Sequence, residues 1–81
     1  MIDETKQKLQ KETEKWLEKI KIERKNIKLV DKSKAKMLEN IDAYISDSQN
    51  FLKKDDLVRA FEAVIWAWAW LEILKEMKVL K

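Results

Sequence analysis

The sequence predicts an all-α protein, a three-helix up-down-up bundle whose long third helix is apolar on two faces. Three observations carry this prediction. The 81 residues include no Gly and no Pro, the residues that most often interrupt helices. Apolar residues recur every three or four positions along three segments, at about 3–28, 33–53 and 56–80. The boundary Lys53-Lys54-Asp55-Asp56 places lysines at the end of one helix and aspartates at the start of the next, as helix dipoles favour.

The composition is that of one small domain spanning residues 1–81. A chain this short buries only about 60–65% of its unfolded surface, so every apolar residue matters for the core. Charged residues make up 41% of the chain, and no Cys is present for a disulfide or a thiolate metal site. The absence of cysteine fits a cytoplasmic protein, and the heavy use of Lys and Glu suggests a thermophilic source.

No secretory or membrane segment is expected. The first residues do not show a basic segment followed by an apolar run. The longest uncharged apolar run, 63–71, has nine residues, whereas a helix that spans a bilayer needs roughly 20.

The residue types point away from catalysis. The chain has no His, which removes the side chain most used for acid-base chemistry and for binding transition metals. The carboxylates that could suggest a metal site are Asp42, Asp47, Asp55, Asp56 and Glu62. Helical metal sites use Glu-x-x-His pairs, so we expect Asp55 and Asp56 to cap a helix and Asp47 to pair with Arg59. The sequence therefore predicts no enzyme activity, no metal, no cofactor and no small-molecule substrate.

The first two helices each carry a single apolar stripe. The stripe of the first helix is narrow, with Leu9, Trp16, Ile20 and Ile27, and with Ile2 and Thr13 filling its gaps. The pattern breaks near residues 29–33, where Asp31 or Ser33 can cap the second helix. The stripe of the second helix is wider and consists of Met37, Leu38, Ile41, Tyr44, Ile45, Ser48, Phe51 and Leu52.

The third helix differs because its apolar residues form two faces. One face contains Leu57, Phe61, Val64, Trp68 and Leu71. At roughly 100° per residue, the other face lies about 180° away and contains Trp66, Trp70, Ile73, Met77 and Leu80. We assign the first face to the bundle and expect the third helix to contact both other helices most closely.

The second half of the chain resembles a known family. The residues that carry the resemblance are Tyr44-Ile-Ser-Asp47, Phe51-Leu52, Asp55-Asp56, Ala60-Phe61-Glu-Ala63 and Trp66-Ala67-Trp68-Ala69-Trp70-Leu71. They are similar to the pattern of the small archaeal proteins grouped as domain of unknown function family 357. Here Ala69 replaces the Gly of that pattern, and Glu72 replaces its closing Asp. The resemblance implies a compact three-helix protein from an archaeon and supplies no catalytic residues.

The second apolar face is the main functional candidate. Exposed apolar area with aromatic and Met side chains is typical of interfaces. The residues predicted to bind a protein partner, or a second copy of the chain as a homodimer, are Trp66, Trp70, Ile73 and Met77. The structural alternative is that the first helix covers this face and leaves the third helix sandwiched. If both hold in part, Trp66 and Trp70 would be half exposed.

The other candidate is nucleic-acid binding through the basic segment 19–36. This segment has eight basic residues and two acidic ones, a local charge of +6. The side chains that could follow a phosphate backbone are Lys21, Arg24, Lys25 and Lys28. The segment has no aromatic residue for base stacking and only one Arg, so a solvated helix face is the alternative interpretation.

Overall fold

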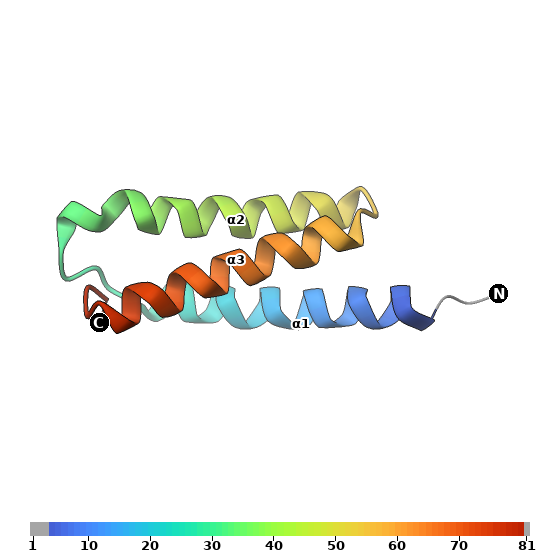
Figure 1. Cartoon of the computed structure of the whole chain (residues 1–81), viewed down its shortest axis with the longest axis horizontal. Coiled ribbons are helices and arrows are strands. Elements are labelled where there is room, and N and C mark those ends of the chain that lie inside the picture. The colour runs from blue at the N-terminus through green and yellow to red at the C-terminus, as the bar shows by residue number, and fades with distance from the viewer. Residues whose placement is uncertain (1–3, 81) are drawn as a thin grey trace.

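The computed structural model describes residues 4–80, which form three helices in an elongated bundle (Figure 1). The chain runs through α1 (Glu4–Asn26), a 3₁₀ turn (Lys32–Lys34), α2 (Ala35–Lys53) and α3 (Leu57–Glu76). Consecutive helices run in opposite directions, so the predicted up-down-up bundle is confirmed. Ile2, which the sequence placed in the first stripe, lies outside the described residues.

The third helix is the central element of the bundle. It runs obliquely between α1 and α2 and packs against both of them (Figure 1). The main core cluster draws on all three helices and on the chain end: Leu17, Ile20, Ile41, Ile45, Val64, Ala67, Leu71, Leu74 and Val79. The expectation that α3 makes the closest contacts with both neighbours is therefore confirmed.

The predicted stripe of α1 faces the bundle. Ile20 is fully buried, and Leu9, Trp16 and Ile27 are partly buried. Thr13 is also buried, and its hydroxyl donates to the Leu9 carbonyl oxygen at 2.7 Å, which satisfies the polar group inside the helix. The sequence analysis missed Leu17, which is only 4% exposed beside this stripe.

Asp31 caps the 3₁₀ turn that precedes α2, whereas the sequence predicted that Asp31 or Ser33 would cap the second helix itself. The Asp31 carboxylate accepts from the Ser33 backbone N–H at 3.0 Å and from the Ser33 hydroxyl at 2.6 Å. These hydrogen bonds favour the ionised form and lower the pKa of Asp31. The cap stabilises the 3₁₀ turn that leads into α2, and Lys34, which precedes α2 directly, makes no side-chain cap.

The buried face of α3 lies between the two faces that the sequence predicted. Its fully or nearly fully buried residues are Leu57, Ala60, Ala63, Val64, Ala67, Leu71 and Leu74. Three of them are alanines, and their small side chains let α2 approach closely. The approach is close enough for the Ser48 hydroxyl of α2 to donate to the Ala60 carbonyl oxygen of α3 at 2.6 Å.

Both α2 and α3 end in the same left-handed motif, although the chain has no Gly. The residue after each helix cap has a positive φ, 61° at Asp55 and 59° at Lys78. The closing hydrogen bonds are Asp55 N–H to Leu52 O and Asp56 N–H to Phe51 O after α2, and Lys78 N–H to Lys75 O and Val79 N–H to Leu74 O after α3. This is the Schellman arrangement, which satisfies backbone carbonyl groups at a helix end.

The chain end after α3 turns back and pairs with the α1–α2 connection. The Val30 N–H donates to the Val79 carbonyl oxygen at 2.8 Å, and Leu29 forms an isolated antiparallel bridge with Leu80. We call residues 29–30 and 79–80 the clasp. The prediction that the third helix continues to residue 80 was wrong, because Lys78 reverses the chain and Val79 enters the core.

Candidate interaction surface

The large apolar side chains that are exposed on α3 and at its C-cap are Val58, Ile65, Trp66, Ile73 and Met77. Three of them lie in one row. Trp66, Ile73 and Met77 are 52%, 45% and 46% exposed. At roughly 100° per residue they lie within about 40° of one another, on a side of α3 that flanks its buried face. We call these three residues the outer face of α3.

The first helix does not cover this face. It packs on another side of α3, where the Trp68 indole N–H donates to the Trp16 carbonyl oxygen at 3.1 Å. The two indole rings meet edge to face, with centroids 5.6 Å apart and planes at 82°. The alternative in which the first helix covers the whole second apolar face is therefore wrong for Trp66, Ile73 and Met77, which stay about half exposed.

An ion pair further along α3 also joins α3 to α1, on the side of α3 where Trp68 contacts Trp16. The Lys75 ammonium lies 2.9 Å from a carboxylate oxygen of Glu23. The hydrogen bond to Glu23 favours the charged form and raises the pKa of Lys75. The Lys75 side chain is therefore paired with α1 and does not pair with a group of the outer face.

The second helix borders one end of the outer face. The Trp66 ring stacks on the Tyr44 ring, with centroids 6.4 Å apart and planes at 21°. An open hollow of about 240 Å³ adjoins this pair, lined by Tyr44, Asp47, Phe51, Arg59, Glu62, Ala63 and Trp66. Sequence reasoning did not include α2 in the site, although Tyr44 and Phe51 are seven residues apart and so share one helix face.

Trp70 and Leu80 belong to the edge of the core. Both are partly buried and pack against the core cluster. The sequence placed Trp66 and Trp70 together as half-exposed residues, but only Trp66 is more than half exposed. Trp70 lies at the margin of the outer face and supports it.

The charges around the outer face are mainly acidic. Glu62 and Glu76 are exposed, and neither forms an ion pair within residues 4–80. Glu72 lies 3.8 Å from Lys75. The predicted pair between Asp47 and Arg59 is wrong, because Arg59 lies 3.7 Å from Asp56 instead. Asp47 is thus an additional carboxylate without an ionic partner in the described part of the chain.

The basic segment is spread over several surroundings. Arg24 makes two hydrogen bonds with the Asp42 carboxylate, at 2.6 and 3.0 Å. Lys21 is partly buried in a hollow that also contains Glu14 and Glu18. Lys25 and Lys28 are exposed. The four predicted phosphate-binding residues therefore do not present four free charges.

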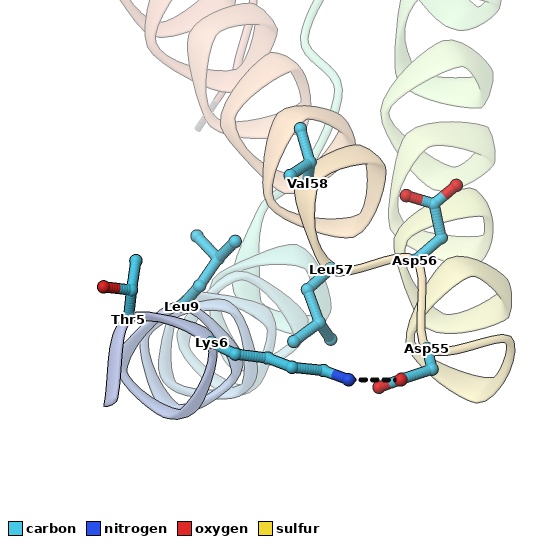
Figure 2. A pocket seen from close by; sticks show the side chains of 7 residues that line it. All are labelled: Thr5, Lys6, Leu9, Asp55, Asp56, Leu57 and Val58. Carbon is cyan, nitrogen blue, oxygen red and sulfur yellow. Dashed lines mark hydrogen bonds and ion pairs between the residues drawn. The ribbon is translucent and has the colours of Figure 1, made fainter. Parts of the chain in front are cut away.

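Another open hollow lies at the opposite end of the bundle from the clasp. Thr5, Lys6 and Leu9 of α1 line it together with Asp55, Asp56, Leu57 and Val58, and Figure 2 shows Lys6 reaching toward Asp55 in the α2–α3 turn. The Lys6 ammonium lies 2.6 Å from Asp55, and the hollow measures about 360 Å³. Asp56 caps α3 as predicted, by accepting from the Arg59 N–H at 3.3 Å. Asp55 was also expected to cap a helix, but it instead has the left-handed conformation after α2 and pairs with Lys6.

Comparison with known proteins identifies the family. A family model described as protein of unknown function, DUF357, matches residues 8–80. The chain belongs to this family. A crystal structure of a DUF357 protein, AF1782 from Archaeoglobus fulgidus, is similar with a TM-score of 0.85 and 52% sequence identity. The match covers 95% of this chain and 96% of the other. Among curated proteins no match is found.

The resemblance seen in the sequence is thus confirmed, and with it an archaeal type of protein. The family description names no activity. Within residues 4–80, the His, Cys, Asp and Glu side chains form no group of three that could hold a metal ion. No helix of this part of the chain is both long enough and apolar enough to cross a membrane.

Proposed function

We propose that this chain is a non-enzymatic protein-interaction module that binds its partner through the outer face of α3. The observation that carries the proposal is the row of Trp66, Ile73 and Met77, each about half exposed on a helix that already supplies the core through another face. Large apolar side chains in one contiguous row are typical of contact surfaces. The absence of His and Cys supports a non-enzymatic role in the cytoplasm.

The shape of the surface supports the same role. Trp66, Ile73 and Met77 have the spacing that helix-binding surfaces use, and the hollow beside Trp66 and Tyr44 can receive one protruding side chain. Trp and Tyr are also enriched among the residues that dominate binding energy. Nucleic-acid binding through the basic segment 19–36 has less support, because Asp42 engages Arg24 and because Lys21 is partly buried in a hollow that Glu14 and Glu18 also line.

Photo-crosslinking tests the proposal. A benzoylphenylalanine residue in place of Ile73 should give discrete crosslinked products in an extract of the source cells. The matched control carries the same residue in place of Ile22, which is 54% exposed on α1 and so no less accessible than Ile73. A second substitution, Met77→Glu, should reduce the products formed at position 73.

The outcomes separate clearly. Products at position 73 that are absent at position 22, including a crosslinked dimer of the chain, support an interaction role for the outer face. The same products from both positions, or none from position 73, contradict it. Circular dichroism of each variant should show that the bundle is intact.

A further inference from the structure

We propose that the outer face of α3 receives an amphipathic helix whose apolar side is flanked by Lys and Arg residues. This inference rests on the proposed function and deepens it by stating the chemistry of the partner. It follows from three features: the spacing of the apolar row, the charges around it, and the surfaces that a second copy of the chain could offer.

The apolar row has the length and direction of a docked helix. Trp66 and Met77 are separated by three turns of α3, about 16 Å along its axis. A helix lying along this row would present apolar residues at positions i, i+4, i+7 and i+11. The hollow lined by Tyr44, Phe51 and Trp66 offers a place for one of these side chains.

The charges beside the row select a basic partner. Asp47 and Glu62 line the hollow at one end of the row, and Glu76 precedes Met77 at the other end. All three are exposed and have no ionic partner in residues 4–80. Arg59 also lines the hollow and lies 3.7 Å from Asp56, and Lys75 is paired with Glu23. Lys78 is the base that follows Met77. The region is therefore acidic on a chain whose net charge is +3.

A second copy of the chain fits the outer face poorly. In a two-fold dimer both copies present the same surface, so the excess of carboxylates would be doubled at the interface. Outside α3, the exposed large apolar residues among those described are Ile22 and Val30. They lie apart on α1 and on the clasp, so outside α3 the described chain offers no matching apolar row. On α3 itself, Val58 and Ile65 are exposed beside the outer face and belong to the same surface that a two-fold dimer would double.

Two synthetic peptides test the charge of the partner. Both are helix-forming, about 18 residues long, with the same Leu and Ile row at helical spacing. One carries Lys and Arg beside the row and the other carries Glu. Calorimetric titration into the full chain at low salt should show the basic peptide binding about tenfold more tightly, the effect of two or three exposed ion pairs. The preference should weaken as salt is added.

A charge reversal with a matched control locates the effect. The double variant Glu62→Lys and Glu76→Lys should abolish or invert the preference for the basic peptide. The control variant Glu18→Lys and Glu39→Lys changes the net charge equally, at exposed positions on α1 and α2. It should keep the preference close to that of the unmodified chain.

Three results would overturn the inference. They are equal affinity for the two peptides, an unchanged preference in the Glu62 and Glu76 variant, and an equal loss in the control variant. Sedimentation measurement of the chain alone adds a further outcome: a dimer that Ile73→Glu dissociates would contradict the basic helix but would uphold an interaction role for the outer face. The proposed function itself fails only if position 73 also gives no specific crosslinks.

Discussion

Lys78 carries a backbone conformation that usually belongs to glycine. Its φ of 59° closes the Schellman motif after α3 and turns the chain towards the clasp. A side chain with a Cβ is disfavoured in this region by about 1–2 kcal/mol. Asp55 holds the equivalent position after α2, but Asp tolerates the left-handed region better, and its carboxylate also pairs with Lys6. Lys78 is thus the more strained of the two residues.

Lys78→Gly should therefore stabilise the protein. We expect the free energy of unfolding to rise by about 0.5–1 kcal/mol, because the relief at Lys78 exceeds the greater freedom that Gly adds to the unfolded chain. Urea unfolding followed by Trp fluorescence measures the change. The control Lys78→Ala keeps a Cβ and should give no increase. A loss of stability with Gly would show that the Lys78 side chain itself holds the helix end.

At the scale of the element, the face of α3 that is buried differs from the face that the sequence predicted. The pattern identified faces centred on Trp68 and on Ile73, whereas the most buried face contains Ala60 and Ala67, which are 0% exposed. Alanines carry little weight in a hydrophobic pattern. They become buried because Ser48 and the rest of α2 approach the helix closely there, and this approach depends on the partner helix.

A larger side chain between α2 and α3 should destabilise the bundle. Ala67→Leu would force α2 and α3 apart, and we expect a loss of about 1–3 kcal/mol in the free energy of unfolding. The matched control is Ala43→Leu on the exposed side of α2, which should change stability by less than about 0.5 kcal/mol. Equal effects at both positions, measured by urea unfolding, would contradict the close packing of the two helices.

At the scale of the whole molecule, the arrangement of the helices could be predicted from the sequence more fully than the contacts between them. The three helices, the cap at Asp56 and the break near residue 30 follow from local patterns in the sequence. The clasp could not be predicted, because it joins Val30 to Val79 through backbone atoms that leave no trace in side-chain periodicity. The exposure of Ile73 was left open for a similar reason: it depends on which side of α3 is contacted by α1, and Trp16 and Glu23 decide this together.

The clasp gives a prediction for the whole molecule. A chain that ends at residue 78 lacks the Val79 carbonyl oxygen, so the Val30 amide should exchange with solvent faster than in the full chain. Val79→Ala removes part of a core side chain but keeps the carbonyl oxygen, and it should preserve the protection of Val30. Hydrogen exchange measured by NMR compares the three proteins. Equal exchange at Val30 in all of them would mean that the bond contributes nothing to closing the linker.

The clasp also has a mechanical consequence. The backbone hydrogen bond between Val30 and Val79 closes residues 30–79 into a loop that contains α2 and α3. Helix α1 precedes residue 30 and is therefore not part of this loop. A force applied to the N-terminus would peel α1 away through its Trp16 and Glu23 contacts without opening the loop. A force applied to the C-terminus would have to break the clasp first. The two ends of the chain should therefore respond to load in a different order, with the α2–α3 hairpin as the last unit to unfold from the N-terminal side.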